Sequence, residues 1–251
     1  MVAALLLSLL PLSAPAQIVN VQARFAGEPE PGLHGAMEAS LDWRTGSQEY
    51  LAVRGGLTGT ANYGNHLFLA LGQGEHGLSS GERTLSRTLE HLRYRYRIHD
   101  HLFAEAFVQH EYNAFRRLQL RGLAGAGPRF LLVREKVLTA AVGVALMIER
   151  EELGHDDLPD AGRVTTDARF SSYVVGQLQL MENLTVAQTL YVQPRADRFS
   201  DVRLLNETAI TARANPRVGL TLGLLLFYDR APPAGVPRLD SQLRTALAVT
   251  F

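Results

Sequence analysis

From Gly35 almost to the end of the chain, apolar and polar residues alternate with a period of two. In the first such run, Met37, Ala39, Leu41 and Trp43 alternate with polar residues, and similar runs recur throughout the chain. Because successive side chains of a β-strand point to opposite faces, each run predicts a strand with one apolar and one polar face. No run in this part of the chain shows the period of 3.6 residues that an amphipathic helix would have. The pattern therefore predicts an all-β protein of about twelve strands.

Alternation alone does not show which face of the strands meets water. A soluble lipocalin-like barrel has its apolar residues inside, and a membrane barrel has them outside. The lengths of the connections favour the membrane barrel, because bacterial barrels alternate short periplasmic turns with longer outer loops. We expect short turns at 61–64, 99–101, 134–136, 181–183 and 215–217, and longer loops at 74–82, 149–163, 194–201 and 230–240.

Aromatic residues on the apolar faces gather at two levels, as the headgroup belts of a membrane protein require. With odd strands running outward, Trp43, Phe170 and Tyr228 fall near the outer rim. Tyr96, Phe130 and Phe251 fall near the periplasmic rim. We therefore expect two aromatic girdles.

Residues 1–16 form an apolar run that ends in Ala14-Pro15-Ala16, which predicts a secretory signal peptide cleaved before Gln17. Residues 17–33 would be a mature N-terminal extension, and residues 34–251 the barrel domain. The chain has no cysteine, which excludes disulfides and the lipid-modified cysteine of a lipoprotein. The 25 basic and 25 acidic residues give zero net charge, so no net field favours nucleic acid as a partner.

These observations predict a transmembrane up-and-down antiparallel β-barrel in a bacterial outer membrane. Its first and last strands should join, because hydrocarbon tolerates no unpaired backbone groups. Its outer face would contact lipid and lipopolysaccharide, and its terminal Phe251 would be the signal that the barrel-assembly machinery recognises. We expect a monomer. The alternative is a soluble secreted barrel with the faces reversed.

The run from His99 to Phe130, H-D-H-L-F-A-E-A-F-V-Q-H-E-Y-N-A-F-R-R-L-Q-L-R-G-L-A-G-A-G-P-R-F, resembles the centre of the salt-induced outer-membrane protein family, a domain-of-unknown-function family. The end of the chain, from Phe227 to Phe251, is similar to the closing strand of that family. One departure is Gly46-Ser47, where the family often has Gly-Asn. The resemblance implies an outer-membrane β-barrel without an assigned substrate, an envelope or salt-stress role, and no catalytic residues.

The polar faces of the predicted strands carry many charges, which would line the lumen. One interpretation is a lumen filled by arginine–carboxylate pairs, with Phe68, Phe107, Tyr173 and Phe227 also pointing inward. The other is a narrow channel whose surplus arginines favour small anions. The predicted lumen-lining residues are Glu38, Asp42, Arg44, Arg54, Arg93, Arg95, Arg97, Glu105, Arg121, Arg129, Glu149, Asp167, Arg169, Arg203, Glu207, Arg213 and Arg244.

No pattern requires a metal, a cofactor or a catalytic site. His99-Asp100-His101 and the aspartates of the 151–160 loop could in principle bind a metal, but neither has the regular spacing of a metal site. An outer-membrane lipid hydrolase would need a serine next to a histidine, and Ser79 or Ser80 with His76 is the candidate combination. We expect no metal, no cofactor and no enzyme activity.

Overall fold

The computed structural model describes residues 31–45, 49–215 and 218–249. The predicted strands are present, and each pairs antiparallel with the next along the chain in one twelve-stranded sheet. A short 3-10 helix, η2 (Ala114–Arg116), lies between β5 and β6. The strands are β1 (Gly32–Arg44), β2 (Tyr50–Tyr63), β3 (His66–Ser79), β4 (Glu82–His99), β5 (Leu102–Asn113), β6 (Leu118–Arg134), β7 (Leu138–Leu153), β8 (Val164–Met181), β9 (Leu184–Pro194), β10 (Val202–Asn215), β11 (Val218–Asp229) and β12 (Leu239–Val249).

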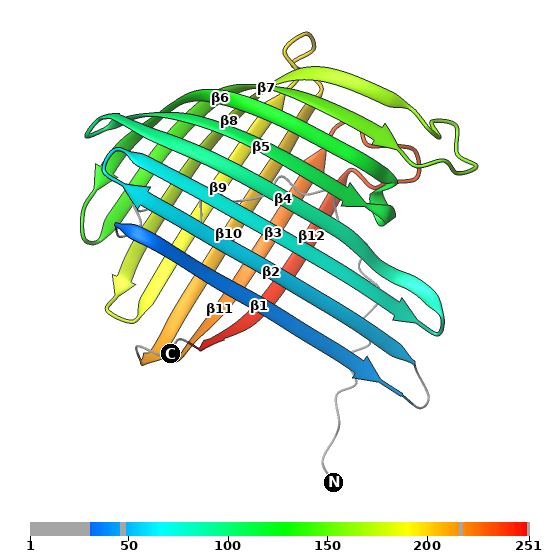
Figure 1. The fold of residues 1–251 in the computed structure, drawn as a ribbon, viewed down its shortest axis with the longest axis horizontal. Helices are drawn as coiled ribbons and strands as arrows, with labels where there is room; N and C mark the ends of the chain where they lie inside the picture. Colours follow the sequence, from blue (N-terminus) through cyan, green and yellow to red (C-terminus); the bar gives the residue numbers. More distant parts are fainter. Residues whose placement is uncertain (1–30, 46–48, 216–217, 250–251) are drawn as a thin grey trace.

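The sheet curls on itself: β1 to β5 form the near wall in Figure 1, β8 to β12 the far wall, and β6 and β7 join them. At one end of the strands, which we call the short-turn end, the connections take two or three residues, as at 64–65, 100–101 and 135–137. At the opposite end, the long-loop end, the connections include 154–163 and 230–238. No helical segment in the described part of the chain is long and apolar enough to cross a bilayer.

The connection between β3 and β4 is shorter than the sequence suggested. The glycine-rich stretch 74–82 was expected to be a loop, but the ladder continues to the pair Ser79–Glu82. Ser80 and Gly81 make the turn with positive φ angles of 50° and 81°. Gly74 and Gly77 lie within β3 and only Gly81 lies in the turn, so composition alone misplaced the loop.

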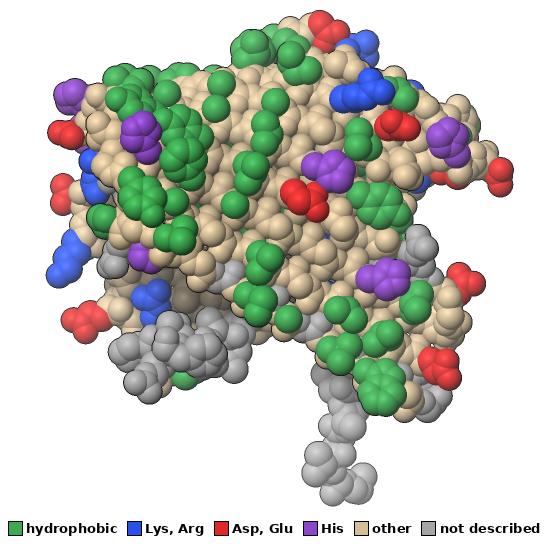
Figure 2. All heavy atoms as spheres, viewed as in Figure 1, with side chains coloured by type: hydrophobic (Ala, Val, Ile, Leu, Met, Phe, Trp, Pro, Cys, Tyr) green, Lys and Arg blue, Asp and Glu red, His purple; other side chains and the backbone are tan. Residues whose placement is uncertain are grey.

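Most charged side chains of the strands lie inside the curled sheet, and the outside is mainly apolar, with the exposed pair Glu90–His110 as an exception. On β4, Leu92 and Ile98 are 56% and 57% exposed, whereas the alternate residues Arg93 and Arg95 are 8% and 4% exposed. Hydrophobic side chains accordingly spread over the face in Figure 2, where most charged side chains lie towards the two ends and one acidic side chain lies beside a histidine within the face. This arrangement is the reverse of a soluble barrel and matches a barrel whose wall faces lipid.

The interior is packed. Aromatic and aliphatic side chains from β5 to β11 meet there in one buried cluster, which includes Phe103, Tyr173, Tyr191, Leu205 and Phe227. Each of these five is at most 5% exposed. The lumen is therefore filled along this part of the wall.

The faces of β3 are the reverse of the sequence interpretation. Phe68 was expected to point inward, which by alternation turns Leu67, Leu69 and Leu71 outward, but Leu69 is 4% exposed and Phe68 is 49% exposed. Both faces of this strand are apolar enough to be buried, so its own pattern does not decide. The neighbouring strand β4 determines which face of β3 turns inward. Leu69 is the partner of Arg93 in the β3–β4 ladder, and directly paired residues share a face.

Two features concern the later strands. The β9–β10 ladder runs from Val202–Pro194 to Ala212–Leu184 without a shift, although the polar residues Gln188 and Asn206 interrupt the apolar alternation of these strands. The expected joining of the first and last strands is not observed. Within the described residues, β1 pairs with β2 and β12 pairs with β11, and no ladder links β1 to β12.

Candidate functional site

The interior wall near the long-loop end is organised around Glu149 of β7, which is 1% exposed. Three arginines from three other strands donate to its two oxygens. Nε of Arg121 on β6 lies 2.8 Å from Oε2, while Nε of Arg169 on β8 lies 3.1 Å from Oε1. Nη1 of Arg203 on β10 lies 2.7 Å from Oε1. Because β7 and β10 are three strands apart, the last contact reaches across the interior.

Each of these arginines has further carboxylate partners. Arg203 also donates to Asp229 Oδ2 at 3.0 Å and to Glu151 Oε2 at 2.9 Å. Arg169 also donates to Asp201 Oδ1 at 3.1 Å. Buried charges are tolerated when they are paired and hydrogen-bonded in this way. We call Arg121, Glu149, Arg169 and Arg203, with these partners, the Glu149 cluster.

The carboxylates of the Glu149 cluster are more numerous than the sequence interpretation assumed. Asp229 and Asp201 were not predicted, yet they are 1% and 7% exposed. They lie at strand ends, where the alternating pattern stops, which explains why periodicity missed them. Other interior or rim charges that sequence reasoning missed are Glu111, Arg116, Glu151, Arg195 and Asp240. Among the described side chains, the long-loop half of the lumen therefore has no surplus of arginine over carboxylate.

A second cluster lies nearer the short-turn end, around Glu105 of β5. Arg93 Nη1 lies 3.0 Å from Glu105 Oε2, and Arg95 Nε lies 2.9 Å from Oε1. Tyr173 on β8 donates its hydroxyl to Glu105 Oε2 at 2.6 Å and accepts a hydrogen bond of 3.0 Å from Arg129 on β6. This chain of contacts also spans the interior, and we call it the Glu105 cluster.

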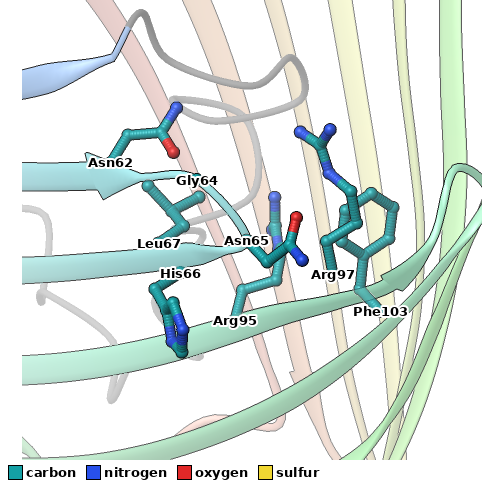
Figure 3. A pocket seen from close by; sticks show the side chains of 8 residues that line it. All are labelled: Asn62, Gly64, Asn65, His66, Leu67, Arg95, Arg97 and Phe103. Atoms are coloured by element: carbon teal, nitrogen blue, oxygen red, sulfur yellow. The ribbon is translucent and has the colours of Figure 1, made fainter.

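A shallow pocket opens at the short-turn end beside the Glu105 cluster. It is lined by Asn62, Asn65, Arg95, Arg97 and Phe103, among others. Figure 3 shows the two arginines and Phe103 on the same side of the strands, with His66 on the opposite side. The guanidinium carbons of Arg95 and Arg97 lie 5.9 and 6.0 Å from the centre of the Phe103 ring. The arrangement concentrates positive charge at this mouth of the lumen.

At the long-loop end, Arg117 joins three connections. It follows η2, adopts a left-handed backbone with φ of 59°, and directs its side chain towards loop 154–163. Its Nη2 lies 2.7 Å from Asp156 Oδ1, and its Nη1 donates to the Ala234 carbonyl at 2.9 Å. Asp160 accepts from Arg117 and from the Ala234 amide. We call Arg117, Asp156, Asp160 and Ala234 the loop clamp.

The loop clamp lowers the pKa of both aspartates below the usual range of aspartate. For Asp156 the main cause is the hydrogen bonding from Arg117. For Asp160, burial alone would raise the pKa, but the amide of Ala234 and the guanidinium of Arg117 together outweigh it. Both carboxylates are therefore engaged by protein groups of two neighbouring connections.

The predicted lumen residues fall into four groups. Arg213 is at a position of the same parity as Arg203 on β10 but is exposed, because β10 has reached the short-turn rim there. Half-buried residues are Arg54, Arg97, Asp167 and Glu207. Buried inside are Arg93, Arg95, Glu105, Arg121, Arg129, Glu149, Arg169 and Arg203. The side chains of Glu38, Asp42, Arg44 and Arg244 lie outside the described part of the structure.

The predicted girdle residues lie near the strand ends. Trp43 is 74% exposed close to the end of β1, and the ring centre of Phe170, the seventh of the 18 residues of β8, lies 5.7 Å from that of Phe199. Tyr228 is the second-last residue of β11. Tyr96 and Phe130 are 37% and 44% exposed towards the short-turn end. Phe251 lies outside the described residues.

The remaining candidate residues lie on β3 and in the turn between β4 and β5. Ser79 and His76 are three residues apart on one strand, so their side chains point to opposite faces of the sheet. His101 Nδ1 donates to the Leu131 carbonyl at 2.9 Å. In the described part of the chain, no group of three or more acidic or histidine side chains is placed to hold a metal ion.

The fold and the inverted distribution of charge define the class of this protein: it is a transmembrane up-and-down β-barrel of twelve strands. The family described as "Protein of unknown function, DUF481" matches residues 37–251, and the chain belongs to this family. The expected membership of a domain-of-unknown-function family is thus confirmed.

Two solved structures have a similar fold. The NanC porin aligns with a TM-score of 0.53 at 11% identity, over 86% of this chain and 100% of its own. The translocator domain of the autotransporter NalP from Neisseria meningitidis aligns with a TM-score of 0.50 at 11% identity, over 91% of this chain and 92% of its own. At sequence identities this low, the similarity shows a shared fold alone. No curated protein matches the sequence.

Proposed function

We propose that this protein is an integral barrel of the bacterial outer membrane whose lumen is closed by its own side chains, and that it serves a structural role in the envelope. The observation that carries the proposal is the Glu149 cluster. Four charged side chains from β6, β7, β8 and β10, none more than 5% exposed, occupy the interior where a porin would hold water. The family resemblance adds a role under salt stress to this proposal.

The proposed location is supported by the outward face and by the apolar N-terminal run. Large apolar side chains such as Leu146, Ile148 and Leu243 are 54–67% exposed on the outside of the strands. Such a surface suits acyl chains of phospholipid and lipopolysaccharide, and the barrel-assembly machinery would insert it. We expect the protein in the outer-membrane fraction after density separation, and recovery from the periplasm would contradict the proposal.

Planar-bilayer recording of refolded protein tests the closed lumen. We expect no steady conductance from the unmodified barrel at neutral pH. The double variant Tyr173→Ala with Tyr191→Ala removes two large interior side chains without changing charge, so it should conduct. Val174→Ala with Leu190→Ala, on the outward face of the same strands, is the matched control and should stay closed. Steady conductance of the unmodified protein would contradict the proposal.

A second candidate function is a narrow channel with a preference for anions. The observation that favours it is the positive mouth formed by Arg95 and Arg97, next to Arg93 and Arg129. If the barrel conducts, reversal potentials in a salt gradient should report anion preference. Arg95→Gln with Arg97→Gln should reduce that preference, and cation preference of the unmodified protein would exclude this function.

We further propose that the protein is not an enzyme and uses no cofactor. The opposite orientation of Ser79 and His76 supports this, because a serine nucleophile needs its base within hydrogen-bond reach. Turnover of phospholipid or lipopolysaccharide by purified protein, lost in His76→Ala or Ser79→Ala, would contradict it.

A further inference from the structure

Three polar side chains form a cluster on the outward face of β9 and β10. Gln188 and Thr208 are direct partners in the β9–β10 ladder, and Asn206 lies one outward position further along β10. Gln188 Nε2 donates to Asn206 Oδ1, and Thr208 Oγ1 donates to Gln188 Oε1 at 2.5 Å. We call Gln188, Asn206 and Thr208 the outward amide cluster.

The outward amide cluster sits in apolar surroundings at the middle depth of the wall. Gln188 is four residues from the start of β9 and six from its end. Leu190 and Leu226 are the two ladder partners of Asn206, and Leu224 is a ladder partner of Thr208. Since a transmembrane β-strand spans the hydrocarbon in about 9–11 residues, this position lies away from both headgroup layers.

The cluster leaves hydrogen-bonding capacity unused. A side-chain amide carries two N–H donors, and the Oδ1 atom of Asn206 already accepts from Gln188. In the described part of the chain, Nδ2 of Asn206 makes no hydrogen bond. Hydrocarbon offers no partner for such donors, so an outward amide at this depth is costly unless another molecule supplies an acceptor.

The neighbouring surface permits close approach of such a molecule. Gly176 on β8 is the ladder partner of Gln188, and a Cβ built on Gly176 would meet no atom within 4 Å. The fold itself therefore does not need glycine at this position. Small residues beside polar ones characterise the contact surfaces of membrane proteins, where packing and hydrogen bonds replace the hydrophobic effect.

From these observations we propose that the outward faces of β8, β9 and β10 form a homodimer interface. A side-chain amide is both donor and acceptor, so two identical clusters complement each other about a two-fold axis, where each patch meets its own copy. The proposal replaces the monomer expected from the sequence, and it rests on the proposed membrane location.

Single-cysteine crosslinking tests the interface, because the natural chain has no cysteine and any introduced one is unique. Asn206→Cys and Gly176→Cys lie on the proposed interface, whereas Leu92→Cys lies outward on β4 and serves as the control. After oxidation in native outer membranes, we expect a disulfide-linked dimer at the first two positions, several-fold above the control. Equal crosslinking at all three, no dimer at any, or a product with another protein's mass would overturn the proposal.

A second variant separates the interface from folding. Gln188→Leu with Asn206→Leu removes the amides from the lipid face and should leave the barrel folded, as judged by its heat-dependent shift on gels. In mild detergent the unmodified protein should elute as a dimer and this variant as a monomer. Dimers of both, or monomers of both, would overturn the interface. The unmodified protein is first fractionated by density. Its absence from the outer membrane would overturn the proposed location, whereas the crosslinking and elution results bear on the interface.

Discussion

The carboxylate of Glu149 on β7 lies 2.7 Å from the guanidinium of Arg203 on β10, three strands further round the sheet. No backbone ladder joins these strands, so the ion pair crosses the interior from one side of the sheet to the other. Two more arginines converge on the same carboxylate. These ion pairs hold β7 and β10 at a fixed distance, and their side chains fill the part of the lumen through which solutes would pass.

Glu149→Gln should destabilise the barrel, because it leaves three buried guanidinium groups around a neutral amide. Removing one partner of a buried ion pair typically costs about 3–5 kcal/mol. The measurement is the unfolding midpoint in urea of protein refolded in lipid vesicles, followed by tryptophan fluorescence.

Glu182→Gln is the matched control, since Glu182 is exposed in the turn between β8 and β9. It should leave the midpoint unchanged. A Glu149→Gln protein as stable as the unmodified one would show that the cluster contributes little net stability.

The loop clamp should weaken in acid. Arg117 lowers the folded-state pKa of Asp156, and Asp160 is lowered as well, so their contribution is fully present above the unfolded aspartate pKa of about 4. It is lost as pH falls through the lower, folded values. Hydrogen exchange of the amides of loop 154–163, corrected for intrinsic rates, should show protection that falls below about pH 4.

Arg117→Gln removes the partner of both aspartates. Protection of loop 154–163 should then be low at neutral pH and should change little in acid. Strand β8 provides the internal reference, since its ladder does not depend on Arg117. If the protection of the loop amides still depends on pH in Arg117→Gln, another group holds the loop.

The orientation of β3 can be tested with spin labels at adjacent positions. A label at Phe68→Cys should be accessible to oxygen dissolved in the bilayer, because Phe68 is 49% exposed on the outer face. A label at Leu69→Cys should be shielded and should disturb packing. The opposite result would restore the face assignment that the sequence pattern suggested.

Deletion of Phe251 should lower the amount of barrel assembled in the membrane. This prediction comes from the sequence, because Phe251 lies outside the described residues and an aromatic residue after the last apolar run resembles the signal read by the assembly machinery. The measurement is the folded fraction on gels of unheated samples, with Phe251→Tyr as the conservative control. Unchanged assembly after the deletion would remove Phe251 from this role.

The sequence by itself determined that the chain forms about twelve antiparallel strands, because a period of two recurs in most of the runs. It also determined the inward face of β4, where four cationic or histidine residues at alternate positions admit one orientation. The interior positions of Arg93, Arg121, Arg169 and Glu149 follow from parity of the same kind. The assignment of alternate side chains to two faces requires only that the segment is a strand, and the sequence pattern shows this directly.

Tertiary structure alone decided which charges meet. The contact of Glu149 with Arg203 depends on the curl of the sheet, and the loop clamp brings Arg117 to Ala234 from 117 residues away along the chain. Asp201 and Asp229 joined the lumen from strand ends, where no alternation remains to be read. Strand β3, apolar on both faces, took its orientation from the arginines of β4. In each case a contact between different strands or loops determines the arrangement. The pattern along one strand carries no information about such contacts.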